Sequence, residues 1–82
     1  MSKLAFGTVI KELRVQKNIT QEKLAELAEV DRTYIYRIEH GLREPSFNVF
    51  LKLIEGLKMN ADEFIFLYKK ELKNEKSEKL KK

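Results

Sequence analysis

Apolar residues recur every three or four positions along most of this chain, which is the spacing of amphipathic helices. The pattern predicts a helix over residues 3–17, a second over 21–28, a third from 32 to about His40, and two more that begin after Ser46 and after Asn60. No segment alternates with the two-residue period of a strand over more than a few residues. The predicted fold is therefore all-α, a compact domain of five helices.

The predicted inner side of each helix is a row of apolar residues three and four positions apart, which we expect to face the core. The first three rows are Phe6, Val9, Ile10 and Leu13, then Leu24, Leu27 and Ala28, then Ile35 and Ile38. The last two are Phe47, Phe50, Leu51, Ile54 and Leu57, then Ala61, Phe64, Ile65, Tyr68 and Leu72.

Residues that favour helix starts mark the boundaries between these segments. Thr20, Asp31 and Ser46 can each cap a helix N-terminus, and Asn60 with Glu63 three positions later resembles a capping box. About three residues separate the second and third helices, too few for an antiparallel hairpin. This spacing is typical of two short helices that meet at a steep angle, as in a helix-turn-helix.

The third predicted helix carries unusual side chains on the side opposite its two isoleucines. They are Arg32, Thr33, Tyr36, Arg37 and His40. Arginine can bind guanine through two hydrogen bonds, and threonine and tyrosine offer a hydroxyl beside a methyl group or a ring. Such a set near the start of a helix is typical of side chains that contact base edges in the major groove of DNA.

The alternative interpretation of this surface is an ordinary solvated helix, with an ion pair between Glu39 and Arg43. It explains the arginines but not the two aromatic rings. A catalytic role has less support, because no carboxylate pair, nucleophile or phosphate-binding loop accompanies His40, the single histidine of the chain. We therefore expect no enzymatic activity and interpret His40 as a solvated residue beside the helix end.

The net charge of +4 supports DNA binding only weakly, because of where it lies. Residues 69–82 hold seven lysines and three glutamates, whereas residues 1–68 hold ten basic and ten acidic residues. Lys/Glu-rich ends are usually solvated extensions of a last helix or frayed tails. We therefore divide the chain into a domain over residues 1–68 and a C-terminal helix extension or frayed tail over 69–82.

Composition also limits the kinds of site. There is no cysteine, so disulfides and thiolate metal sites are excluded, and one histidine makes a histidine metal cluster improbable. No apolar run approaches the ~20 residues of a membrane span, and the N-terminus lacks the pattern of a signal peptide. We expect a cytoplasmic protein with no cofactor, no membrane association and no small-molecule ligand.

Residues 19–46, ITQEKLAELAEVDRTYIYRIEHGLREPS, resemble the Cro-type phage-repressor helix-turn-helix family, also called the XRE family. The resemblance covers about residues 6–67 and joins TQEKLAE, an A-x-V corner, YI-x-x-IE-x-G and R-x-P-S. Within the family, DRTYI is most similar to the controller proteins of restriction–modification systems. Antitoxins and phage regulators share the same core.

This resemblance implies a lambda-repressor-like domain that binds a near-palindromic operator in double-stranded DNA as a homodimer, with the third helix in the major groove. By position it assigns base contacts to Arg32, Thr33 and Tyr36. It assigns contacts with the DNA backbone to Gln21, Tyr34, Arg37, Arg43 and Lys17. It also implies a structural ion pair between Arg14 and Glu39.

The fifth helix has apolar residues beyond its inner row, because Phe66 and Leu67 point elsewhere on the helical wheel. They could be surplus core, but the resemblance favours a dimer interface there. The predicted function is that of a dimeric, sequence-specific transcriptional regulator. The alternatives are an antitoxin that represses its own operon and a protein-interaction module that does not bind DNA.

Overall fold

The computed structural model describes the backbone of residues 1–80 and the side chains of residues 1–76. It contains five helices and, within residues 1–80, no strand. The helices are α1 (Lys3–Gln16), α2 (Gln21–Leu27), α3 (Arg32–Glu39), α4 (Phe47–Gly56) and α5 (Ala61–Leu80). The predicted all-α fold with five helices is confirmed.

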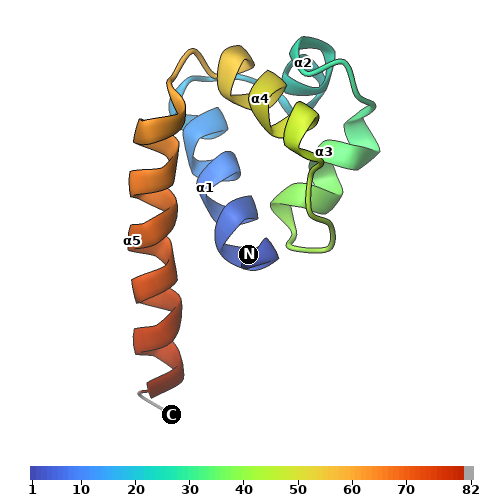
Figure 1. Ribbon diagram of the computed structural model, residues 1–82. Coiled ribbons are helices and arrows are strands. Elements are labelled where there is room, and N and C mark those ends of the chain that lie inside the picture. Colours follow the sequence, from blue (N-terminus) through green and yellow to red (C-terminus); the bar gives the residue numbers. More distant parts are fainter. Residues whose placement is uncertain (81–82) are drawn as a thin grey trace.

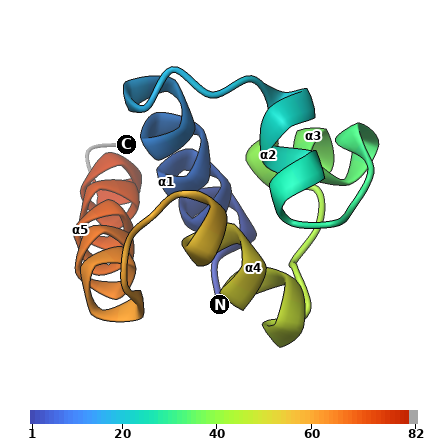
Figure 2. The ribbon, with the colours of Figure 1, turned by 90° about the horizontal axis from the view of Figure 1, so that it is seen from above.

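The first helix forms the centre of the molecule. α1 packs against α3 on one side and against α5 on the other, so that α3 and α5 lie on opposite sides of it (Figure 1). α4 packs against α2 and α5 and closes the space between them, which is clear when the molecule is seen from above (Figure 2). This arrangement leaves the outer side of α3 free of contacts from α5.

Among residues 1–76, the side chains buried between these helices are apolar apart from the carboxylate of Glu39. Three phenylalanine rings, Phe6, Phe50 and Phe64, meet where α1, α4 and α5 come together, with ring centroids 5.0–5.7 Å apart. The hydrophobic cluster at the centre of the core consists of Phe6, Val9, Ile10, Leu13, Leu24, Ala25, Ala28, Ile35, Ile38, Leu53, Ile54, Leu57 and Phe64.

The inner side predicted for α4 is partly wrong. Phe47 is 72% exposed and Leu51 is also exposed, whereas Leu53, which the predicted row omits, is fully buried. The buried side of α4 is centred on Leu53, Ile54 and Leu57, and Phe47 and Leu51 lie together on one flank of it. On α2, Leu27 was likewise expected to face inward and is exposed.

The inner side predicted for α5 is also shifted. Ile65 is 43% exposed rather than buried, and Leu67, expected to point away from the core, packs partly against it. The buried side is centred on Phe64, with Leu67 and Tyr68 three and four positions later. Each residue turns a helix by about 100°, so this side cannot also include Ile65. Phe66 is exposed, as expected.

α5 continues without a break past residue 68 to Leu80, so the boundary between a 1–68 domain and a 69–82 tail stays a prediction. Two hydrogen bonds attach this helix to the start of α1. The Ser2 backbone N–H donates to the Tyr68 hydroxyl at 2.7 Å, and the Ser2 hydroxyl donates to a Glu75 carboxylate oxygen at 2.9 Å. Within residues 1–80 no helix is long and apolar enough to span a membrane.

The predicted caps begin their helices as expected. The side chains of Thr20, Asp31 and Ser46 accept hydrogen bonds from backbone N–H groups three residues later. Asn60 and Glu63 each accept the other's backbone N–H, the reciprocal pattern of a capping box.

In four helices, the residue two positions after the last helical residue has a left-handed backbone conformation. These residues are Asn18 (φ 57°), Glu29 (φ 58°), Gly41 (φ 70°) and Lys58 (φ 54°). In each case the next residue donates its N–H to a carbonyl five positions back, which satisfies a free carbonyl at the helix end. Only Gly41 adopts this conformation without a steric cost from a Cβ atom.

Gly7 permits the close crossing of α1 over α3. A Cβ atom at this position would lie 2.1 Å from the backbone carbonyl oxygen of Ile38, a separation that no real Cβ contact has. A larger residue would therefore push α1 and α3 apart. The position of α3 in the fold depends on this glycine.

Candidate nucleic-acid interface

The orientation of α3 is set by its two isoleucines. Ile35 and Ile38 are fully buried, and the Asp31 carboxylate caps the start of the helix by accepting the Tyr34 N–H at 2.9 Å. All the residues predicted on the opposite side are exposed: Arg32, Thr33, Tyr36, Arg37 and His40. Hydrogen-bonding side chains thus cover the outer side of α3 along its length.

The corner between α2 and α3 is closed by Val30, which packs partly against the core. The Val30 N–H donates to the Ala25 carbonyl at 3.0 Å, which ends α2 and redirects the chain toward α3. The buried Ala25 and Ala28 leave room for the two short helices to pack against each other.

Arg14 and Glu39 join α1 to the end of α3. The Arg14 Nε donates to Glu39 Oε2 at 2.6 Å, and Nη2 donates to Oε1 at 3.2 Å. The Glu39 side chain is 0% exposed and that of Arg14 is 13% exposed. Arg14 also donates to the Ile19 carbonyl at 2.8 Å. The carboxylate of Glu39 thus bonds to Arg14, not to Arg43 as in the solvated-helix interpretation.

Gln21 links this buried pair to the outer side of α3. Its Nε2 donates to Glu39 Oε1 at 3.0 Å, and its Oε1 accepts a hydrogen bond from Arg32 Nη1 at 3.3 Å. A carboxylate can only accept, so the amide must turn its NH₂ group toward Glu39. Its oxygen is then directed at Arg32, and the guanidinium is held at the start of α3.

The loop after α3 is held by Tyr34 and Arg43. The Arg43 guanidinium lies 4.5 Å from the centre of the Tyr34 ring, and the Tyr34 hydroxyl accepts the Ser46 N–H at 3.3 Å. A cation–π contact at an exposed site contributes about 0.5–1 kcal/mol, which favours this position of the Arg43 guanidinium. Arg37 and Lys17 are exposed, the first on α3 and the second at the C-terminal end of α1.

One feature of α3, an aromatic stack, was not predicted from the sequence. The rings of Tyr36 and His40 are stacked, with centroids 4.0 Å apart and planes inclined by 26°. The His40 Nδ1 also lies 2.9 Å from the Tyr36 carbonyl oxygen. Two aromatic residues four positions apart on a helix are neighbours on its surface, so the spacing alone could have indicated the pair.

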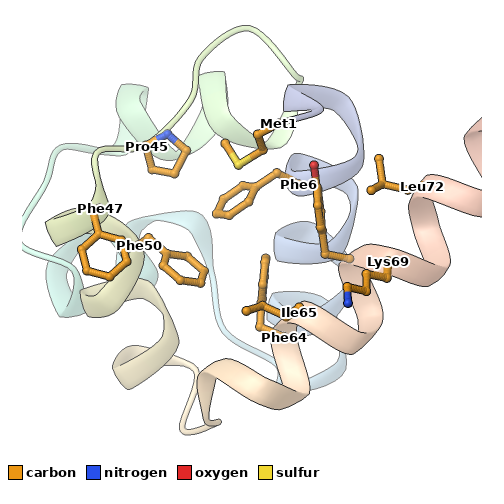
Figure 3. Close-up of a pocket in the computed structure, with 10 residues that line it drawn as sticks. Met1, Phe6, Pro45, Phe47, Phe50, Phe64, Ile65, Lys69 and Leu72 are labelled. Atoms are coloured by element: carbon orange, nitrogen blue, oxygen red, sulfur yellow. The ribbon is translucent and has the colours of Figure 1, made fainter.

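A second surface, away from α3, is apolar. A groove of about 550 Å³ lies between the start of α1 and helices α4 and α5 (Figure 3). Phe47 and Phe50 border it from α4, Ile65 and Phe64 from α5, and Met1 from the chain start (Figure 3). The flanking positions of Phe47 and Ile65, which sequence reasoning placed in the core, thus form an exposed apolar surface.

A helix-turn-helix family model matches residues 10–64, which runs from the middle of α1 to Phe64 and includes α2, α3 and α4. The chain belongs to the helix-turn-helix family. The matched segment contains most of the core and the whole outer side of α3.

Controller proteins of restriction–modification systems are among the similar proteins. Control protein C.MunI of Mycoplasma sp is 36% identical over 70 residues, which are 84% of this chain and 95% of C.MunI. The structure of C.AhdI of Aeromonas hydrophila is 37% identical, with a TM-score of 0.73, covering 76% of this chain and 94% of that one. The resemblance to XRE-type controller proteins is confirmed.

Another controller protein, C.Esp1396I, is 31% identical with a TM-score of 0.84, covering 90% of this chain and 96% of the other. A further structure shows C.Esp1396I as a tetramer in complex with its natural 35 base-pair operator. The regulator RamB of Mycobacterium tuberculosis is much longer. It is 31% identical over 64 residues, so the matched part is 78% of this chain and 14% of RamB.

Proposed function

We propose that this chain is a sequence-specific DNA-binding transcriptional regulator that binds a near-palindromic operator as a homodimer and has no enzymatic activity. The observation that carries the proposal is the outer side of α3, where hydrogen-bonding side chains are exposed along a helix whose inner isoleucines are fully buried. The similar controller proteins include one bound to its operator, which supports the same role. We further propose that the protein acts in the cytoplasm.

The start of α3 supplies the base contacts in this proposal. An arginine fork fits the O6 and N7 atoms of guanine, and threonine and tyrosine can bond base edges or contact the methyl group of thymine. Their position near the N-terminal end of α3 is the part of a recognition helix that usually enters the major groove. The proposed base-contacting residues are Arg32, Thr33 and Tyr36.

The residues around α3 supply contacts with the DNA backbone, which position the protein without selecting a sequence. Gln21 and Arg43 are each held by a neighbour on α3, so their polar groups are ordered before DNA arrives. Arg14 and Glu39 satisfy each other inside the domain and take no part in DNA contacts. The proposed backbone-contacting residues are Gln21, Tyr34, Arg37, Arg43 and Lys17.

Selection of sites from random-sequence duplexes by the wild-type protein tests this function. The expected product is a near-palindromic motif with half-sites about 10 base pairs apart, bound with an affinity that falls steeply as salt rises. Binding to all duplexes with equal affinity would overturn sequence-specific regulation. Failure to bind any duplex at low salt would favour a protein-interaction module instead.

For the dimer, we propose the apolar groove of α4 and α5 as the centre of the interface. α5 presents two apolar surfaces, because Ile65 borders the groove and Phe66 lies outside it. The groove is continuous with the exposed ring of Phe47. Phe66 is 63% exposed, and the Lys70 ammonium lies 5.6 Å from its ring centre. The groove gathers apolar side chains from α4, α5 and the start of the chain on one open surface, and such a patch marks an interface.

Sedimentation equilibrium of two matched variants distinguishes this surface from the predicted Phe66–Leu67 interface. Ile65→Glu places a charge beside the groove and should give a folded monomer with native helicity. Phe66→Glu, one position away and 63% exposed, should remain a dimer. If Phe66→Glu dissociates and Ile65→Glu does not, the interface lies on the Phe66 side. A wild-type protein that is monomeric at tens of micromolar would overturn both proposed interfaces.

A further inference from the structure

Tyr36, a proposed base contact, forms a stacked pair on the outer side of α3 with His40, to which the contacts proposed above give no role. Their rings are nearly parallel, inclined by 26°, with centroids 4.0 Å apart. Both side chains are exposed, and Tyr36 retains 45% of its surface for contact with another molecule. The stack therefore covers one side of the tyrosine ring and leaves the rest of it open.

The His40 ring is fixed by its own backbone environment. The Tyr36 carbonyl oxygen accepts the His40 backbone N–H at 3.0 Å, and it lies 2.9 Å from His40 Nδ1. A carbonyl oxygen only accepts, so Nδ1 must carry a proton and donate it. The imidazole is thus folded back over the last turn of α3, where a donor to a helix-end carbonyl is favourable.

This arrangement restricts Tyr36 before any DNA is bound. A tyrosine on a free helix surface can move between rotamers, and ordering it on binding costs conformational entropy. The imidazole blocks one of the positions open to the ring and stabilises the position seen here through aromatic contact. The hydroxyl at the end of Tyr36 is then presented in one direction.

We propose that His40 is a positioning residue for DNA recognition, which holds the Tyr36 ring by stacking and so sharpens the preference for the base pair that Tyr36 contacts. This inference rests on the proposed function, because it requires Tyr36 to contact a base. It assigns no direct DNA contact to His40. His40 acts on the operator through Tyr36 alone.

Five variants test the inference against the operator selected by the wild-type protein and against random duplex. His40→Ala removes the stack and should weaken operator binding about three- to ten-fold, with little effect on random duplex. His40→Phe keeps an aromatic ring without the Nδ1 bond and should restore most of the affinity. In a Tyr36→Ala background, His40→Ala should cause no further loss. Glu55→Ala, exposed on α4, is the control for substitution elsewhere.

The base preference of each variant, measured by selection from random duplexes, gives the readout that a merely structural role would not change. His40→Ala should relax the motif at the same base pair as Tyr36→Ala, and His40→Phe should not. Equal losses on operator and random duplex would make His40 a phosphate contact and overturn the inference. A loss that persists in the Tyr36→Ala background would overturn it too.

The free protein gives a second measurement that does not depend on DNA. Long-range ¹H–¹⁵N spectra should show the neutral His40 ring protonated at Nδ1, with ring-current shifts from Tyr36 that vanish in Tyr36→Ala. A freely rotating imidazole would contradict the inference. If the wild type binds no duplex, the proposed function fails and this inference with it. Binding by His40→Ala with unchanged preference overturns this inference alone.

Discussion

Replacing Glu39 by alanine should destabilise the protein by about 3 kcal/mol, because it leaves a nearly buried guanidinium without its partner. The Glu39 side chain is 0% exposed and Arg14 only 13%. Removing one member of a buried ion pair costs about 3–5 kcal/mol in general. Arg14 keeps its bond to the Ile19 carbonyl, so we expect the lower end of this range.

Thermal unfolding followed by circular dichroism measures this cost. For a domain of this size, 1 kcal/mol corresponds to a shift in Tm of about 4–8 °C, so Glu39→Ala should melt about 12–24 °C lower than the wild type. The matched control is Glu26→Ala, which removes the carboxylate of an exposed pair 3.4 Å from Lys23. Exposed pairs contribute at most about 1 kcal/mol, so this variant should melt close to the wild type.

A Tm of Glu39→Ala equal to that of Glu26→Ala would refute the reasoning, because the buried pair would then stabilise no more than an exposed one. The double variant Arg14→Met with Glu39→Leu separates charge from packing. It removes both charges, and should recover most of the stability that Glu39→Ala loses. If it does not, the loss arises from packing and not from an unpaired guanidinium.

Two further predictions concern the backbone. Gly7→Ala should destabilise by about 1–3 kcal/mol in urea unfolding, because the added Cβ would lie 2.1 Å from the Ile38 carbonyl oxygen and must separate α1 from α3; unchanged stability would mean that the crossing is loose. Lys58→Gly should stabilise the protein by up to about 1 kcal/mol, because Lys58 has a φ of 54° that glycine adopts without a Cβ clash. A loss of stability would show that the lysine side chain stabilises the fold by more than its backbone strain costs.

The parts of the fold that depend on local chemistry could be predicted from the sequence. Caps such as Asp31 and Ser46 start their helices where expected, because a side-chain oxygen beside free N–H groups acts within a few residues. The outward side of α3 follows equally well, since two isoleucines three positions apart define an inner side on a short helix.

The errors arise where several helices compete for one surface. The periodicity of α4 and α5 gives the relative angles of their side chains, but not which flank a neighbouring helix covers. Phe47 and Ile65 were therefore placed in the core, although they border an open groove. The close approach at Gly7 likewise depends on the crossing of α1 with α3, which no local pattern encodes.

In the candidate site, too, features of a single helix could be predicted from the sequence, whereas contacts between helices could not. The exposure of Arg32, Thr33 and Tyr36 could be predicted, because it depends on a single helix. The link from Glu39 through Gln21 to Arg32 joins the two ends of α3 through the start of α2, and its hydrogen bonds require the fold. Local sequence patterns do not predict contacts between distant segments of the chain.

The most direct test of DNA recognition by α3 is the base preference of Arg32→Ala. Arg32 lies exposed at the start of α3 and is held by Gln21 at 3.3 Å, so its guanidinium is poised to contact a base. Selection from random duplexes should show Arg32→Ala relaxed at one base pair per half-site, with operator affinity lower by about 1–3 kcal/mol. Lys11→Ala, which removes one exposed positive charge from α1, should keep the wild-type motif. An Arg32→Ala motif identical to that of the wild type, or the same loss in both variants, would contradict recognition through the outer side of α3.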